Sequence, residues 1–430
     1  MIDTHLKANG FNMKYNAILF IISAVMLCAC GRKQAESDSE TDDTASDVDT
    51  LSLSTETTRT DSGEPNTDDT QPPETDSQSD TGSDTGADTD TPSLVDANGI
   101  PVFDNCPVQQ ASNACEENWC RIEEGTFLYG TSPDAAVPCS NGYGEFPVQV
   151  TLTRPFLIQQ HEVTQAQWEA MGFSNPARDV HPQKPITWIN WLEAAAYCNA
   201  LSQQEGLDSC YDLSACQGEV GTGCPSGSSY YQYGCEWVQD TTDDFVPDLY
   251  VCNGEIHRYP NYYECPGYRL PTAAEWQYAA RACTSAATYN GDMPSDLNFG
   301  GFCDPVPTLD PIAWHCGNAQ TLQIIKTRRP NLWNLYDMLG NAREYVDHQN
   351  VGMTMEYDEG KKGPLVDPIG DRSSHPEGVV TKSIAGGSYR VDACLVRPAY
   401  LYPDGGRPRG DDYGFRPVRT IFTADADSGK

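Results

Sequence analysis

The chain has 430 residues and a formal net charge of -35, with 62 acidic residues against 27 lysines and arginines. This length is enough for one or two domains of ordinary size. No part of the chain carries a basic patch, so we do not expect nucleic acid among its partners. The acidic residues concentrate between positions 31 and 100, which hold roughly 19 of them and 3 basic residues, about 16 net negative charges.

Residues 1–29 predict a signal peptide. A lysine precedes an apolar run over residues 17–29, which is too short for a stable transmembrane helix and typical of a signal core. The string Leu27-Cys28-Ala29-Cys30 is similar to a bacterial lipobox, in which Cys30 is lipidated after cleavage in front of it. Met13 is then the alternative start, because polar residues are unusual before a signal. An uncleaved anchor or a plain secretion signal is the competing interpretation.

Residues 30–100 predict a lipidated cysteine followed by a disordered linker. The linker is rich in Asp, Ser and Thr and has almost no large apolar residues, so it cannot bury enough surface to offset the entropy of ordering. Gly31 follows Cys30 where an inner-membrane retention signal usually has Asp. We therefore expect a protein of the bacterial cell envelope, anchored through Cys30 to the outer membrane, with a flexible leash.

Residues 101–425 have a globular composition and most of the cysteines. Without Cys28 and Cys30, 15 of the 17 cysteines remain in the exported part. Such a density outside the cytosol predicts disulfides, and an odd number leaves at least one cysteine unpaired or joined between chains. Zinc binding is the alternative, but no Cys-x-x-Cys pair occurs anywhere in the chain.

The predicted elements are short. An alternating stretch over residues 120–132 predicts a strand and turn, and residues 147–164 predict two extended pieces broken by Pro155. A helix is expected after the N-cap Thr164. The clearest helix covers residues 190–207, where Cys198 lies on the apolar stripe and is expected in the core.

A further helix is expected after Thr272, with Glu275 completing a capping box. Between the last two helices, residues 208–267 predict a Cys-rich insertion stapled by disulfides. Its aromatic residues form either a ligand surface or a cover over the disulfides: Tyr230, Tyr231, Tyr233 and Trp237. Few helices in a long irregular chain predict an α+β domain with little regular secondary structure.

Four segments, in this order and spacing, resemble the formylglycine-generating enzyme family, also called the sulfatase-modifying-factor domain. They are "EEGTFLYG", "KPITWINWLEAAAYCNALSQQEGL", "GYRLPTAAEWQYAARA", and "NLWNLYDMLGNAREYVDH" followed by "AGGSYRVDACLVRPAYLYPDGGRPRGDDYGFRPVR". The resemblance runs from about Cys120 to Arg419. It implies an elaborated C-type-lectin-like α+β fold, in agreement with the elements above.

The family's enzymes oxidise a sulfatase cysteine to formylglycine, using oxygen and a copper ion held by two thiolates. Paired soft thiolates suit Cu(I). In the family these cysteines follow a Gly-Gly-Ser-aromatic string, which is Gly386-Gly387-Ser388-Tyr389 here. The first expected position is Val391, and the second falls within Ala393–Pro398, where Cys394 is the only cysteine. One thiolate is a poor Cu(I) site, so we do not expect copper.

Three accounts of Cys394 stay open. It is a buried residue or half of a structural disulfide, or a single reactive thiol in the family's cleft beside Arg390 and Arg397. The third account makes it a metal ligand completed by a histidine: His315, His348 or His375. Cys394 and Ser388 are the weak catalytic candidates of this sequence.

The resemblance also implies a calcium site. Asp337 and Glu344 would supply carboxylates, and Gly340 and Ala342 backbone carbonyls, which are the hard ligands that Ca2+ requires. Alternatively, the two carboxylates cap turns or pair with Arg343. The resemblance further implies that three arginines brace carboxylates within the fold: Arg397, Arg416 and Arg419.

The leading functional hypothesis is therefore a surface-tethered lipoprotein whose domain binds a peptide, protein or glycan and lacks copper-dependent oxidase activity. An oxidase or related oxidoreductase acting on exported proteins, with Ser388 and Cys394 at its centre, is the first alternative. A disulfide-hardened structural or adhesion module of the envelope is the second.

Overall fold

A computed structural model describes residues 115–132, 145, 147–222, 250–252, 256–294, 297, 303–349, 364–369, 382–404 and 409–422. The expected signal peptide, the lipidation site Cys30 and the acidic linker lie outside these ranges. So do His375 and the aromatic group Tyr230, Tyr231, Tyr233 and Trp237. Among the described residues, no helix is both long and apolar enough to cross a membrane.

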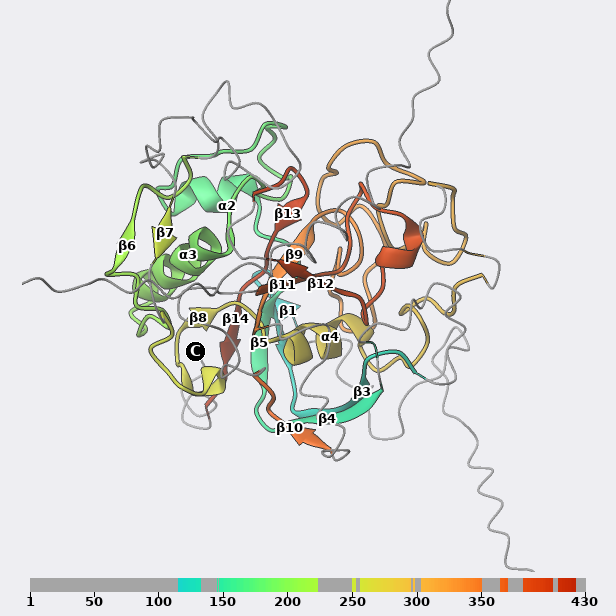
Figure 1. Cartoon of the computed structure of the whole chain (residues 1–430), viewed down its shortest axis with the longest axis horizontal. Coiled ribbons are helices and arrows are strands. Elements are labelled where there is room, and N and C mark those ends of the chain that lie inside the picture. Colours follow the sequence, from blue (N-terminus) through green and yellow to red (C-terminus); the bar gives the residue numbers. More distant parts are fainter. Residues whose placement is uncertain are drawn as a thin grey trace, which may run out of the picture. The chain divides into compact units, whose positions relative to one another are not determined.

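The described residues form three α-helices, two of which begin after the N-caps that the sequence predicts (Figure 1). They are α2 (Gln165–Ala170), α3 (Trp191–Gln204) and α4 (Ala273–Arg281). Each begins with a complete capping box, in which the N-cap side chain and the third helical residue satisfy each other's backbone N–H groups; the N-caps are Thr164, Asn190 and Thr272. The described residues also contain two 3-10 turns, η3 (Tyr262–Glu264) and η4 (Ala393–Leu395).

The strands are short and form mixed sheets. The five-stranded sheet has the order β1-β2-β5-β14-β8, with β1 (Cys115–Glu116), β2 (Trp119–Ile122), β5 (Phe156–Gln159), β14 (Val418–Thr420) and β8 (Tyr268–Arg269). All of its pairings are antiparallel. This sheet joins both ends of the described chain, since β14 lies between β5 and β8 (Figure 1).

The other sheets hold the remaining strands. The three-stranded sheet has the order β10-β4-β3, with β10 (Leu365–Val366), β4 (Val148–Leu152) and β3 (Gly125–Tyr129). The four-stranded sheet has the order β12-β11-β9-β13, with β12 (Leu401–Asp404), β11 (Lys382–Ala385), β9 (Arg343–Gln349) and β13 (Tyr413–Gly414). The pair β6 (Cys216–Gln217) and β7 (Val251–Cys252) stands apart from these sheets. The break expected at Pro155 separates β4 from β5 and is confirmed.

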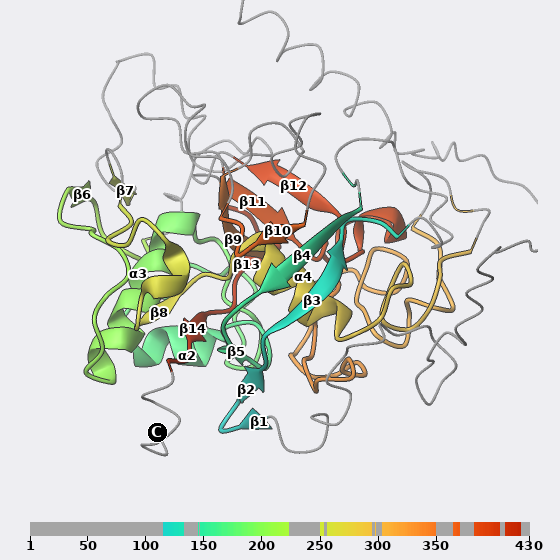
Figure 2. The same ribbon diagram turned by 90° about the horizontal axis from the view of Figure 1, so that it is seen from below.

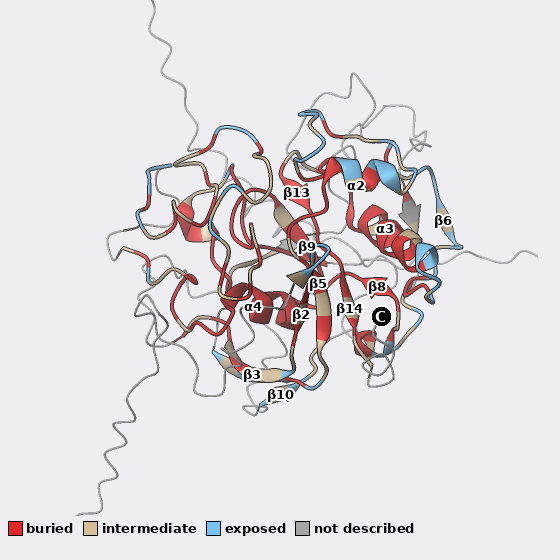
Figure 3. Ribbon diagram, turned by 180° about the vertical axis from the view of Figure 1, so that it is seen from behind, coloured by how far each residue is buried: buried red, intermediate tan, exposed pale blue. Residues whose placement is uncertain are grey.

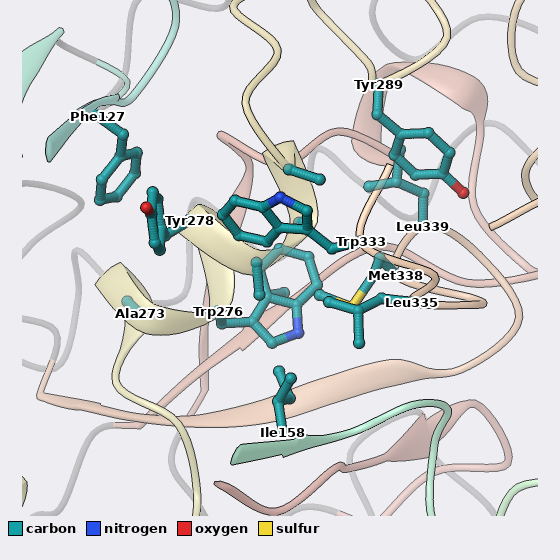
Figure 4. Close-up of a cluster of buried hydrophobic side chains, with 14 of the residues drawn as sticks. Phe127, Ile158, Ala273, Trp276, Tyr278, Tyr289, Trp333, Leu335, Met338 and Leu339 are labelled. Atoms are coloured by element: carbon teal, nitrogen blue, oxygen red, sulfur yellow. The ribbon is translucent and has the colours of Figure 1, made fainter. Parts of the chain in front are cut away.

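Helix α4 is the centre of the larger core. All nine of its residues are buried (Figure 3), and β3 and β4 run across it (Figure 2). Trp276 of this helix lies among Ile158, Trp333 and Met338 (Figure 4). A surface helix typically buries only one apolar stripe, whereas α4 is buried on every side.

Helix α3 lies in a second core with Trp168 and Phe415. Cys198 is in this core, fully buried and free, as its position on the apolar stripe predicted. Burial raises the pKa of its thiol well above the ordinary value. Cys198 is therefore a packing residue, and it is an unpaired thiol of the kind that the odd count predicted.

Disulfides close several loops among the described residues. Two lie within residues 208–267, Cys210–Cys265 and Cys216–Cys252, as expected for a stapled insertion. Two more join Cys115 to Cys120 and Cys303 to Cys316. Cross-links of this density restrict the unfolded chain and compensate for the scarcity of regular secondary structure.

Candidate functional site

The Gly-Gly-Ser-Tyr string lies against the segment expected to bind calcium. Gly386 and Gly387 follow β11 with positive φ angles of 87° and 69°, which lets the chain turn sharply. Gly340 donates its backbone N–H to the Gly386 carbonyl at 2.8 Å, and Tyr389 donates to the Asn341 carbonyl at 3.0 Å. The fold thus brings together the two motifs that carry the predicted site residues.

The surroundings of Ser388 indicate a structural role. Its side chain is fully buried, and its hydroxyl donates to Asp412 at 2.6 Å. The same carboxylate forms an ion pair with Arg343 at 3.0 Å. Because no surface of Ser388 is accessible, the hydroxyl positions the loop and cannot meet a substrate. This burial argues against the catalytic role expected for Ser388.

Cys394 is disulfide-bonded and buried at the start of the 3-10 turn η4, whose N-cap is Asp392. A disulfide leaves no thiolate for a nucleophile or a metal ligand. The accounts of Cys394 as a reactive thiol and as a metal ligand are therefore wrong for this structure, and the account of a structural disulfide holds. Arg397 does not activate a thiol, since it donates to the Cys394 carbonyl at 2.7 Å and pairs with Glu145 at 2.6 Å.

The positions expected for copper ligands carry apolar side chains. Val391 is half-buried and packs against the larger core. Val396, five residues further on, is fully buried in the same core. Neither side chain can bind a metal, and no other cysteine lies between Gly386 and Arg419 in the sequence. The chain therefore has no thiolate pair in this region.

The four residues expected to bind calcium are all described. Asp337 is buried with a φ of 53°, and its Oδ2 accepts the Lys326 backbone N–H at 2.7 Å. Burial raises the pKa of the Asp337 carboxyl to about 6, although that hydrogen bond opposes the rise. Gly340 has a φ of 76°, and Ala342 is buried.

Glu344 does not fit the predicted calcium set. Its Oε1 lies 2.6 Å from Arg416 Nη2, and its Oε2 accepts from Arg416 Nε at 2.7 Å and from the indole of Trp276 at 2.8 Å. Both oxygens are thus engaged by a fully buried guanidinium. The described residues contain no group of three or more His, Cys, Asp or Glu side chains placed to hold a metal.

The expected pairing of the carboxylates with Arg343 is wrong for Glu344. Glu344 pairs with Arg416, whereas Arg343 pairs with Asp412. The expected bracing role of Arg416 and Arg397 is confirmed, since each binds a carboxylate through two guanidinium nitrogens. Arg419 donates to the Pro266 carbonyl at 3.2 Å.

Sequence reasoning missed Glu162, which lies beside this pair. Glu162 is fully buried, its Oε1 accepts the Ala342 backbone N–H at 3.4 Å, and its pKa is raised well above the ordinary value by burial and by Asp337. Arg416 also donates to the carbonyls of Gln159, Tyr336 and Asp337. A single arginine therefore organises oxygens from two distant segments, at residue 159 and at residues 336–344, and the motifs that carried the family resemblance did not include Glu162.

Of the three histidines considered as partners of Cys394, only His315 has a described side chain. His315 is fully buried, with Nε2 at 2.8 Å from Asp310 Oδ1 and Nδ1 accepting the Gly317 N–H at 3.1 Å. Both ring nitrogens are thus engaged, which removes His315 as a metal ligand. The backbone of His348 lies in β9, but its side chain is outside the described residues, as is the whole of His375.

Similar proteins include one curated relative and several solved structures. "Chaperone protein LppX" of Paenibacillus barcinonensis is 28% identical over 215 residues, which are 46% of this chain and 62% of that relative. The match therefore spans less than two thirds of the relative's length. The solved structures include Treponema denticola variable protein 1 (23% identity, TM-score 0.47, 70% of this chain and 94% of the other).

Two further solved structures are also similar to this chain. PvdO from Pseudomonas aeruginosa has 16% identity and a TM-score of 0.45 over 74% of this chain and 98% of its own. CarF has 21% identity and a TM-score of 0.43 over 71% and 98%.

Residues 106–421 match the family described as FGE-sulfatase, the sulfatase-modifying factor enzyme 1-like domain. This range contains every motif that carried the resemblance and both halves of the Glu344–Arg416 pair. The mixed sheets, the few capped helices and the long irregular segments agree with the α+β domain expected from the sequence. Because the match covers most of the chain, this protein belongs to the FGE-sulfatase family.

Proposed function

We propose that this protein is a ligand-binding module of the FGE-sulfatase family without copper-dependent oxidase activity. The observation that supports the proposal is the state of Cys394, which is disulfide-bonded in the segment where the resemblance implies two free thiolates. Val391 and Val396 fill the neighbouring positions with apolar side chains. Cu(I) prefers soft sulfur ligands, so this segment has no group with which to hold it.

The ligand surface of this proposal lies beside the Gly386–Asp392 loop. Trp314 is half-buried, packs against Tyr389 and Leu322, and carries the guanidinium of Arg328 over its ring at 3.5 Å. Next to Tyr389, Arg390 pairs with Asp411, and both side chains are substantially exposed. Aromatic rings held rigid beside charged groups are typical of protein surfaces that bind peptides or glycans.

This choice of surface is tested with a Trp314→Ala variant on a peptide and glycan array. We expect the variant to lose the ligands that the wild-type protein retains, while its melting temperature stays close to that of the wild-type protein. The matched control is Val180→Ala, since Val180 is a large apolar side chain that is exposed elsewhere on the surface. Equal binding by both variants would place the ligand surface in another part of the molecule.

We also propose that Cys30 anchors the domain to the outer membrane through the acidic linker. The supporting features are the lipobox-like string and the composition of residues 30–100. Metabolic labelling with a fatty-acid analogue tests this proposal. The wild-type chain should take up the label and sediment with membranes, and Cys30→Ser should do neither. A labelled Cys30→Ser chain would contradict it.

The absence of oxidase activity has a direct product assay. The purified domain is incubated with copper, oxygen and a peptide carrying the sulfatase-type cysteine, and aldehyde is measured by hydrazide capture and mass spectrometry. We expect the peptide cysteine to stay unmodified at every copper concentration. Aldehyde formed by the wild-type protein would support the oxidase alternative instead and refute this proposal.

A further inference from the structure

A lysine and an aspartate lie in contact inside the four-stranded sheet, at the end of β11 that is remote from the Gly386 loop. Lys382 begins β11, and Asp347 lies on the antiparallel neighbour β9. The Lys382 Nζ is 2.7 Å from Asp347 Oδ1. Both side chains are buried, with 0% of Lys382 and 1% of Asp347 exposed. Water is therefore excluded from the pair.

The surroundings of Lys382 Nζ are largely apolar. The ring of Trp191 lies 4.0 Å from this nitrogen, and Trp191 is itself buried in the second core. Within the described residues, Asp347 Oδ1 is the oxygen that Nζ contacts. An ammonium group has three N–H donors, so the charged form of Lys382 is poorly solvated at this position.

The carboxylate of Asp347 is held by two further side chains. His257 Nε2 lies 3.0 Å from Oδ1 and 2.8 Å from Oδ2. The Tyr211 hydroxyl lies 3.2 Å from Oδ2, and because it accepts the Leu270 backbone N–H, its own proton points to the carboxylate. The ring of Tyr262 stacks on His257 at 4.2 Å and holds the imidazole in this orientation.

We propose that Lys382 and Asp347 condense to an isopeptide bond that covalently joins β11 to β9. The Lys382 amine forms a bond to Asp347 Cγ, and one carboxyl oxygen leaves as water with two of the three protons of the former ammonium group, while the third stays on the amide nitrogen. A positively charged ion-paired lysine and a negatively charged aspartate become one neutral amide, so atoms and charge balance without any oxidant or cofactor. His257 donates a proton to the departing oxygen and recovers one from the nitrogen.

Two physical effects favour this condensation. Two groups fixed in contact on neighbouring strands react with an effective concentration that can reach about 10⁵ M or more, because no translational freedom remains to be lost. The burial of an ion pair is also costly, and an amide in the same place carries no net charge. The product then lies in an interior where water cannot easily reverse the reaction.

The ionised state of Asp347 sets the rate and does not forbid the reaction. Burial alone would raise the pKa of Asp347, but His257 and Lys382 outweigh burial and lower it well below its ordinary value. The reacting species is thus the minor pair of neutral amine and carboxylic acid, which forms when one proton moves between the two touching groups. We therefore expect slow maturation after folding.

The mass of the intact wild-type protein tests the proposal. After complete reduction of the disulfides, the chain should be lighter than its sequence predicts by the mass of one water molecule. Trypsin should fail to cleave after Lys382, and the peptide of residues 373–390 should appear joined to the peptide of residues 344–361. A reduced chain of full mass, with normal cleavage after Lys382, would refute the bond, as would a mass loss that maps to another site.

Variants distinguish the proposed chemistry from other losses of water. Lys382→Arg keeps a positive charge near Asp347 but has no reactive amine, so its reduced mass should equal the sequence mass. His257→Gln should show a smaller linked fraction at the same age of the sample.

Lys184 and Asp179 provide the control within the same molecule, because their 2.6 Å contact lies at the surface. That pair should stay unlinked, and a bond there would show that proximity alone explains the reaction.

Discussion

Calcium binding and ion pairing would give the Glu344 carboxylate two different partners. In the structure its carboxylate is the partner of the buried Arg416, at 2.6 Å, and also accepts from Trp276. A calcium ion bound to Glu344 would have to displace this guanidinium, which would then be buried without its counter-charge. In the structure, Arg416 therefore supplies the counter-charge of Glu344.

The first prediction follows for Glu344→Ala. The variant leaves the Arg416 charge unpaired in the interior, so we expect a loss of roughly 3–5 kcal/mol in the free energy of unfolding. Chemical denaturation with calcium and with chelator should give the same loss. Glu123→Ala is the control, because Glu123 pairs with Arg121 at the surface and should lose less than about 1 kcal/mol. Stabilisation of the wild-type protein by calcium that vanishes in Glu344→Ala would restore the calcium site.

The second prediction concerns the thiols. Cys394 is disulfide-bonded, and Cys198 is free but fully buried with a raised pKa. Iodoacetamide should therefore label neither cysteine in the folded, unreduced protein. Unfolding without reduction should expose Cys198 alone of these two, and reduction should be required for Cys394. Rapid labelling of Cys394 in the folded protein would contradict the disulfide and revive the reactive-thiol account.

At the scale of elements, the turn before β9 is held by close backbone contacts. Gly340 has a positive φ, and a Cβ at this position would lie 2.2 Å from the Trp314 carbonyl oxygen. Gly206, which follows α3, has nearly the same φ of 73° but no atom within 4 Å of such a Cβ. Substitution of these two glycines by alanine therefore separates the free-energy cost of a left-handed backbone from that of a steric clash.

The third prediction compares these two glycines. Gly206→Ala should lose about 1–2 kcal/mol of stability, which is the ordinary cost of a left-handed alanine. Gly340→Ala should lose roughly 3 kcal/mol or more, because it adds a clash with fixed backbone. Thermal unfolding of the two variants measures the difference. Equal losses would mean that the contact between this turn and Trp314 is not close in solution.

The helices of this fold are encoded locally, and the sheets are not. Thr164 and Thr272 cap helices through residues three positions away, so the sequence predicts where α2 and α4 begin. The parallel pairing of β13 with β9 joins segments about seventy residues apart and depends on the whole core. Short strands of two to five residues give little periodic signal, so their order in the sheets could not be predicted from the sequence.

The residues of the candidate site could likewise be predicted only in part from the sequence. The family motifs identified the Gly386 loop in the sequence and showed that the thiolate pair is missing from it. The partner of Glu344 and the position of Glu162 are properties of the folded chain, since Glu162 is 180 residues from Ala342, which donates to it. Pairing depends on which charges are buried together, and a sequence does not show that.

At the scale of the whole molecule, a covalently reinforced domain is suited to life outside the cytosol. Four described disulfides close loops in both cores, and the proposed bond between Lys382 and Asp347 would join two strands of the four-stranded sheet. Neither type of bond requires the family's oxidase activity. A tethered binding module of the proposed kind would have to resist proteolysis and unfolding at the cell surface, and these bonds would serve that need.

The absence of a thiolate pair for Cu(I) is the central claim, and an anaerobic competition titration tests it most directly. Cu(I) is presented to the unreduced protein as the coloured complex of a chelator, with ascorbate as the reductant. We predict that the protein removes no copper from the chelator, because Cys394 is disulfide-bonded and Val391 and Val396 are apolar. Removal of one equivalent of Cu(I) by the wild-type protein, but not by Cys394→Ser, would contradict this account.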